Sequence, residues 1–337
     1  MASTRPTIHD VARRAGVSKS LVSLALRGSP KVADASREAI LSAAAELGYR
    51  PNAAARSLAD RRSRTVGVLV LDLHNPVFAE ILDGIQSEVR AQGYSTMLVS
   101  GDAEPELEAA ELDKLLEFQV EGLILVSHRL STAALRHFAT EVPTVVVSRD
   151  DIHGPRIDTV SNDDFAGAGL AVQHLIALGH ERITHLSGGD NPAAIERERG
   201  YRTTMKAAGL ARAVHVVPGG LTDAAGYAAA VTALSHASSP TAMFVANDIA
   251  ALGALGAIQE SGRSVPRDIS VVGYDGIALG ALRTLSLTTV AQPLSSMGAL
   301  AARRLFGRIA RPGDRAHHLR VESALIVRGS TARPRRR

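Results

Sequence analysis

The chain has no cysteine and no tryptophan, and aromatic residues make up only 3% of its 337 residues. The absence of cysteine excludes disulfide bonds, thiolate metal sites and cysteine nucleophiles. The absence of tryptophan excludes an indole ring as a stacking surface for a ligand. There is no run of roughly eighteen apolar residues, and the amino terminus, MASTRPTIHD, lacks the apolar stretch of a signal peptide. We therefore expect an intracellular, cytoplasmic protein that contacts no membrane.

Charge is unevenly distributed along the chain, which is long enough for two or three domains. Residues 1–64 hold 12 basic and 5 acidic residues, whereas residues 65–327 hold 21 basic and 29 acidic residues. From Arg328 onward there are 5 arginines and no acids, and we assign no role to the basic tail at 331–337, which holds four of them. A basic head on an acidic body predicts that the head alone binds a polyanion.

The head, residues 1–50, has the pattern of three short helices. Thr7 and Asp10 have the spacing of a capping box, and Gly16 can end a first helix over residues 8–15 in the left-handed conformation. A third helix is expected over residues 35–47. The apolar residues of this third helix that we expect to face inward are Ile40, Leu41, Ala44 and Leu47.

The second helix lies within GVSKSLVSLALRG, residues 16–28, with Ser18 as its N-cap. Two short helices joined by a glycine-containing turn are typical of a helix-turn-helix unit. Small and basic side chains at the start of the second helix can donate to base edges and phosphates in a major groove, and Leu24 can contact a thymine methyl. The alternative, an amphipathic helix with a solvated outer face, leaves an exposed leucine unexplained. The face that we expect to meet DNA consists of Lys19, Ser20, Ser23, Leu24 and Arg27.

Residues 51–63 are expected to form a hinge helix and linker. Pro51 ends the third helix, Asn52 can cap a new one, and the helix formers up to Leu58 are too few to be stable alone. We expect such a segment to become helical only when contacts outside the segment stabilise the helix. Leu58 can wedge between base steps in a minor groove, although a plain linker is the alternative.

The body alternates continuous apolar strands with amphipathic helices from Thr65 onward. This pattern predicts a parallel sheet covered by helices on both faces, repeated in two similar halves that meet near Asn162. Ligands of such folds bind beyond the carboxyl ends of the strands, here in a cleft between two lobes. Polar residues follow several predicted strands, including Asn75, Ser127, Ser148, Asn247, Asp275 and Gln292.

No motif in the chain indicates an enzyme. A Walker loop, GxGxxG after a strand, HExxH and GxSxG are all absent, and the 12 histidines are scattered. We therefore expect no catalytic residues, no metal and no cofactor. Two other hypotheses stay open beside a DNA-binding regulator: an enzyme that uses the cleft, and a solute-binding protein, which would need an export signal.

The motifs resemble those of the lactose-repressor/galactose-repressor (LacI/GalR) transcription regulators over nearly the whole chain, residues 7–332. The resemblance implies a three-helix DNA-binding domain followed by a two-lobed core like that of periplasmic sugar-binding proteins. The matching stretches, in family order, are TIHDVARRAGVSKSLVSLALRG, ELGYRPNAAARSL, HNPVFAEI, HLIALGHERI, ERERGY, DISVVGYDG, LTTVAQP and LIVRGSTA.

The resemblance implies a repressor that binds a palindromic double-stranded operator as a homodimer and is controlled by a small molecule, a sugar or, alternatively, a non-sugar such as a nucleobase. The implied core lobes are residues 64–162 with 293–318, and 163–292 with 319–330. The implied DNA-binding residues are Thr7, Ser18, Lys19, Ser20, Ser23, Leu24, Arg27, Asn52, Ala55, Arg56 and Leu58. The implied effector-binding residues are Asn75, Phe78, Ser148, Asp163, Arg197, Asn247, Asp275 and Gln292.

Three of these residues depart from the family pattern. Arg27 stands where asparagine is common in the family. Leu24 stands where many relatives carry arginine, so the bases of the operator cannot be assigned from the sequence. Ser148 stands where the family usually has aspartate, which removes a possible bidentate partner for sugar hydroxyls.

Overall fold

The computed structural model describes residues 6–50, 62–149, 151–152, 154–236 and 239–335, and the chain divides into two compact units, Met1–Arg64 and Thr65–Arg337. In the first unit, three helices enclose a small apolar core around Val11, Val22 and Ile40, none of which is exposed. The helices are α1 (Ile8–Ala15), α2 (Lys19–Leu26) and α3 (Asp34–Glu46).

The ends of α1 and α2 form as the sequence predicts. The Asp10 carboxylate accepts a hydrogen bond from the Thr7 backbone N–H at 2.9 Å, and Gly16 is left-handed with φ 67°. The Ser18 hydroxyl oxygen accepts from the Leu21 N–H at 3.2 Å. The expectation for α3 is wrong at Leu41, which is 49% exposed, because the buried face of the helix instead passes through Ala43.

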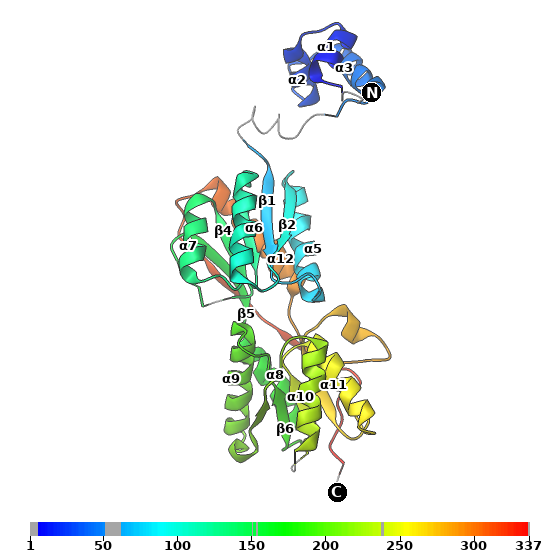
Figure 1. The fold of residues 1–337 in the computed structure, drawn as a ribbon, viewed down its shortest axis with the longest axis vertical. Helices are drawn as coiled ribbons and strands as arrows, with labels where there is room; N and C mark the ends of the chain where they lie inside the picture. The colour runs from blue at the N-terminus through cyan, green and yellow to red at the C-terminus, as the bar shows by residue number, and fades with distance from the viewer. Residues whose placement is uncertain (1–5, 51–61, 150, 153, 237–238, 336–337) are drawn as a thin grey trace. The chain divides into compact units, whose positions relative to one another are not determined.

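The second unit consists of two lobes, each a six-stranded sheet between two layers of helices (Figure 1). The sheet of the N-lobe has the order β11-β5-β4-β3-β1-β2, and every pairing in it is parallel. Its strands are β1 (Thr65–Val70), β2 (Ser95–Ser100), β3 (Gly122–Val126), β4 (Thr144–Val147), β5 (Ile157–Asn162) and β11 (His318–Val321). Its helices are α5 (Pro76–Ala91), α6 (Pro105–Glu117), α7 (Thr132–Glu141) and α12 (Leu294–Ala310).

The sheet of the C-lobe has the order β12-β10-β9-β8-β6-β7, and its edge strand β12 runs antiparallel to β10. The strands are β6 (Ile183–Leu186), β7 (His215–Val217), β8 (Ala242–Val245), β9 (Ser270–Asp275), β10 (Thr288–Ala291) and β12 (Ala324–Ile326). The α-helices are α8 (Asp164–Ala177), α9 (Pro192–Ala207), α10 (Asp223–Ser235) and α11 (Asp248–Glu260). Two 3₁₀ turns, η1 (Ala211–Ala213) and η2 (Ala278–Ala281), complete this lobe.

The central strands of each sheet are buried on both faces, which explains why they are apolar without alternation. In β1, Val68 packs toward α5 and α12, whereas the next residue, Leu69, packs toward α6 and α7. In the C-lobe, α10 and α11 cover one face and α8 and α9 cover the other. Consequently we look for polar residues that face a ligand at the strand ends and on the segments that follow them.

The chain crosses between the lobes three times. The first two crossings come after β5 and after β10. The third does not follow residue 318, because β11 continues to pair with β5 as far as Val321. The segment after Ser330 is held against the C-lobe, because the Ala332 carbonyl oxygen accepts a hydrogen bond from the Ser270 hydroxyl at 3.0 Å.

Glycines allow α10 and α11 to pack closely. A Cβ atom on Gly253 would lie 1.9 Å from the Asp223 carbonyl oxygen, whereas a Cβ on Gly256, one turn further along α11, would meet nothing nearer than 3.9 Å. Backbone atoms cannot move aside as a flexible side chain can.

Gly253→Ala is therefore expected to lower the free energy of unfolding by about 1–3 kcal/mol, the usual cost of overpacking. Gly256→Ala is the matched control, and we expect it to be neutral or to stabilise by up to about 1 kcal/mol through better helix propensity. Urea unfolding followed by far-UV circular dichroism measures both variants. Equal effects of the two substitutions would contradict the close packing of these helices.

Candidate functional site

The first candidate surface is the outer face of α2 in the amino-terminal unit. Lys19, Ser20, Leu24 and Arg27 are exposed, with Leu24 39% exposed, while Val22 and Ala25 point into the core. Leu24 is not part of the apolar core of the unit, so this face has the composition of a surface that meets a partner. Thr7 and Ser18 are exposed at the helix starts, and Ser23 is half-buried.

The remaining predicted DNA-binding residues belong to the expected hinge. Asn52, Ala55, Arg56 and Leu58 lie outside the described residues, so their roles stay predictions.

The second candidate site is a cleft of about 250 Å³ between the two lobes of the core. Seven of the eight predicted effector-binding residues line it, at the carboxyl ends of strands from both sheets, as such folds require. An apolar wall of Leu71, Val77, Phe78, Leu221 and Ile249 completes the cleft. The seven predicted residues are Asn75, Phe78, Ser148, Arg197, Asn247, Asp275 and Gln292.

Asp163 does not line this cleft. It is the N-cap of α8, where its carboxylate accepts from the Ala166 N–H at 2.8 Å, and it faces a smaller adjoining pocket with Arg320. The neighbouring Asp164 instead meets Arg197. In the sequence the two aspartates cannot be told apart, because the start of α8 decides which one caps the helix and which one meets Arg197.

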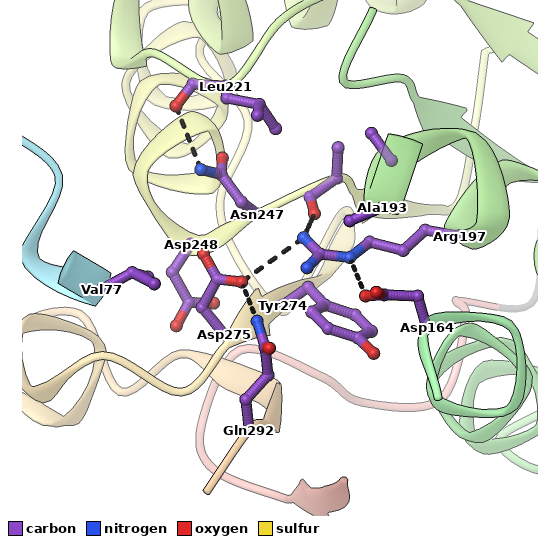
Figure 2. Close-up of polar contacts among 12 residues, drawn as sticks. Val77, Asp164, Ala193, Arg197, Leu221, Asn247, Asp248, Tyr274, Asp275 and Gln292 are labelled. Atoms are coloured by element: carbon purple, nitrogen blue, oxygen red, sulfur yellow. Dashed lines mark hydrogen bonds and ion pairs between the residues drawn. The ribbon is translucent and has the colours of Figure 1, made fainter. Parts of the chain in front are cut away.

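Arg197 lies at the centre of the polar side of the cleft (Figure 2). Its Nε donates to Asp164 at 2.7 Å, and its terminal nitrogen donates to the Ala246 carbonyl at 2.7 Å. The same nitrogen lies 3.4 Å from the Asp275 carboxylate, and the guanidinium carbon lies 3.7 Å from the centre of the Tyr274 ring. Burial by itself lowers the pKa of Arg197, but the carboxylates of Asp164 and Asp275 outweigh it and hold the pKa above its ordinary value. The guanidinium is therefore a fixed, permanently charged donor.

Asp275 ends β9 and faces Arg197 and Gln292. Its carboxylate accepts from Gln292 Nε2 at 2.7 Å, and its backbone has a positive φ of 114°. Burial raises the pKa of Asp275 to about 7, against the opposing effect of Arg197. Close to neutral pH this carboxyl group can thus accept or donate a hydrogen bond.

Asp248 supports the site from behind. The sequence pattern places it with Asn247 directly after a predicted strand, but it is not among the implied effector-binding residues. This fully buried carboxylate accepts from the N–H groups of Gly276 and Ile277 at 2.8 and 2.9 Å and from the Thr289 hydroxyl at 2.7 Å. It thereby fixes the turn that follows Asp275. Burial raises the pKa of Asp248 to about 6. Its place beside Asn247, directly after a strand, is the signal that the sequence offers.

Asn247 is held by its own hydrogen bonds. Its side-chain oxygen accepts from the Ala250 N–H at 2.9 Å, which caps α11, and its side-chain nitrogen donates to the Leu221 carbonyl at 3.0 Å. The amide is therefore oriented before any ligand arrives, which reduces the entropy lost on binding.

The described residues form neither a metal-binding cluster nor a membrane-spanning helix. Among them, no group of three or more histidine and acidic side chains is placed to hold a metal ion. No helix among the same residues has the length and apolar character needed to cross a membrane.

Family comparisons match both units. Residues 7–52 match the family described as bacterial regulatory proteins, lacI family, and residues 172–331 match a periplasmic binding protein-like domain. The chain is 35% identical over 329 residues to the ribose operon repressor of Escherichia coli K12, covering 96% of this chain and 99% of that protein.

Solved structures agree with these matches. The lac repressor dimer bound to operator and the anti-inducer ONPF is similar with a TM-score of 0.87 and 29% identity, covering 98% of this chain and all of that one. A LacI family regulator from Enterococcus faecium with bound ribose is similar with a TM-score of 0.73 and 30% identity, covering 80% of this chain and all of that one.

Proposed function

Because the chain belongs to the lacI family of bacterial regulatory proteins and is a DNA-binding transcriptional regulator, we propose that it represses transcription from a palindromic operator as a homodimer. We further propose that a small neutral sugar in the cleft changes its affinity for DNA. The effector assignment rests on the cluster of Arg197, Asp275 and Gln292, which lines the cleft together with apolar side chains. A sugar has the matching chemistry, since its hydroxyl groups both donate and accept while its C–H faces pack on apolar side chains.

The charge of the cleft favours a neutral ligand. The positive charge of Arg197 is already opposed by Asp164 and Asp275, and Asp72 and Asp223 add negative charge to the lining. A phosphate or carboxylate placed there would meet uncompensated acids. The proposal is therefore a free sugar rather than an acidic derivative.

A nucleobase fits this cleft less well. A flat aromatic ligand needs stacking partners, and Phe78 is the one aromatic side chain among the described residues that line the cleft, apart from the imidazole of His74 at its exposed rim. The ring of Tyr274 is fully buried and already covered by the Arg197 guanidinium.

The response to effector follows from linkage. A ligand changes affinity for DNA only by its different affinity for two arrangements of the protein, typically by about 1–3 kcal/mol. Side chains of both lobes line the cleft, and the lobes also touch directly through Arg129 and Asp190, 3.1 Å apart. Sugar bound between the lobes is thus expected to alter how they sit against each other.

Selection of bound duplexes from a random library tests the DNA half of the proposal, and gel shifts with a panel of pentoses and hexoses test the effector half. We expect a palindromic consensus whose binding is weakened by one or a few sugars and by no nucleobase. Mass analysis after incubation with each sugar tests the enzyme alternative, for which we expect no product. No preference for any duplex over random competitor would refute the proposal.

Lys19 provides a sharper test of the head. Lys19→Ala is expected to weaken binding to the selected operator by about tenfold or more, because one charged donor to DNA is lost, and to lower the salt slope by about one if that donor meets a phosphate. Lys31→Ala, also an exposed lysine of the head but outside α2, is the control. Equal losses in both variants would indicate general electrostatic attraction rather than a reading face on α2.

A further inference from the structure

A second pocket, of about 330 Å³, lies in the C-lobe at the end of the sheet opposite the cleft. Its residues Arg182, Thr241 and Ile269 directly precede β6, β8 and β9, so they stand at the amino ends of these strands. The carboxyl-terminal segment adds Arg335. We call this site the arginine pocket, and its charged and polar lining consists of Arg182, Ser239, Thr241, Arg263, Asp268 and Arg335.

Two guanidinium groups of the arginine pocket are bridged by a neutral residue. Arg182 Nε donates to the Ser239 carbonyl oxygen at 3.2 Å, and Arg263 donates to the Ser239 hydroxyl at 2.9 Å. Because both bind atoms of one serine, two like charges are held close together. No carboxylate pairs with either of them among the described residues, and Arg263 is only partly exposed.

Among the described residues that line the pocket, Asp268 is the one acidic residue, and it is already engaged. The Asp268 carboxylate accepts from the Ser264 backbone and hydroxyl at 2.9 and 2.8 Å and pairs with Arg335 at 3.2 Å and Arg267 at 3.7 Å. The lining therefore carries three guanidinium groups against one carboxylate, an excess of two positive charges.

We propose that the arginine pocket binds a phosphate group, free or carried by a small metabolite, between Arg182, Arg263 and Arg335. A phosphate monoester carries about −1.5 to −2 charge at neutral pH, which matches the excess, and planar guanidinium groups bind its oxygens in pairs. An anion here also removes the repulsion between the two arginines bridged by Ser239. The volume leaves room for the rest of a phosphorylated small molecule, and this site is independent of the sugar proposed for the cleft.

Calorimetric titration of the full-length protein at constant ionic strength tests the proposal, with inorganic phosphate and glucose 6-phosphate as probes. The double variant Arg182→Gln, Arg263→Gln is expected to lose at least about tenfold in affinity for both probes, since two charge-assisted contacts are removed. Arg212→Gln is the control, because Arg212 is an exposed arginine of η1 outside the pocket. Thermal unfolding in chloride verifies that each variant is folded.

Tighter binding of glucose 6-phosphate than of inorganic phosphate would assign the site to a phosphorylated metabolite, and equal binding would assign it to free phosphate. Both results require the loss in the double variant. Binding by wild type that persists unchanged in the double variant would place the anion elsewhere, for instance on the basic head, and would overturn the proposal. Absence of binding by wild type would overturn it as well.

Discussion

Replacing Arg197 by lysine is expected to lower sugar affinity by about a hundredfold, the scale of truncating a buried, hydrogen-bonded charge. Lysine keeps the charge, but it has no planar fork that can donate to Asp164 and the Ala246 carbonyl together while lying on the Tyr274 ring. The contacts that hold the charged end of residue 197 in place beside the cleft are then lost. Titration calorimetry with the sugar found in the panel measures the effect.

Operator binding of this variant without sugar is expected to stay within about threefold of wild type, since the residue lies in the core and not in the head. Arg202→Lys is the matched control on the same helix, because that arginine is exposed and pairs only with Glu198 among the described residues. Gel shifts with and without sugar should show a lost response in Arg197→Lys and an intact response in Arg202→Lys. An undiminished response in Arg197→Lys would remove this residue from the effector site.

The free energy of unfolding is expected to fall, relative to the Asp275→Asn variant, as the pH rises from about 4 to about 7. Burial raises the pKa of Asp275 from 3.8 to about 7, so over this range the folded protein keeps a proton that the unfolded chain releases. The unfolded state then binds fewer protons, and stability decreases with pH. At about 1.4 kcal/mol per pKa unit, the full loss is on the order of 4 kcal/mol.

Urea unfolding of both proteins at several pH values measures this difference as a slope, which does not depend on how stable the variant is at any single pH. Asp268→Asn is the control, because hydrogen bonds from Ser264 lower the pKa of Asp268 and its titration therefore falls below this window. Parallel profiles for wild type and Asp275→Asn would show that the carboxyl group is ionised throughout, with Arg197 overcoming burial.

Much of the architecture is local in origin and could therefore be predicted from the sequence. The capping pair Thr7 and Asp10, the left-handed Gly16 and the N-cap Ser18 set the ends of α1 and α2 within a few residues of chain. Uninterrupted apolar runs identified most of the buried strands, and the residues that follow them include six that line the cleft: Asn75, Ser127, Ser148, Asn247, Asp275 and Gln292. Residues that follow strands indicate a ligand site because parallel strands bring their carboxyl ends to one edge of the sheet, where ligands bind.

Prediction failed where the outcome depended on contacts between distant segments. Leu41 has the spacing of a core residue, yet only the packing of three helices decides which stripe of α3 is buried. Strand β11 is short and half polar, and its place beside β5 depends on pairing across more than a hundred residues of chain.

The sequence by itself determined the two kinds of unit, the positions of most of their helices and central strands, and the residue types that follow those strands, because these depend on neighbours along the chain. Only the tertiary structure decided that Asp164 rather than Asp163 meets Arg197, that Asp248 holds the turn after Asp275, and that Arg182, Arg263 and Arg335 converge on one pocket. Those outcomes depend on burial and on side-chain direction in three dimensions, and both exist only after the lobes have folded.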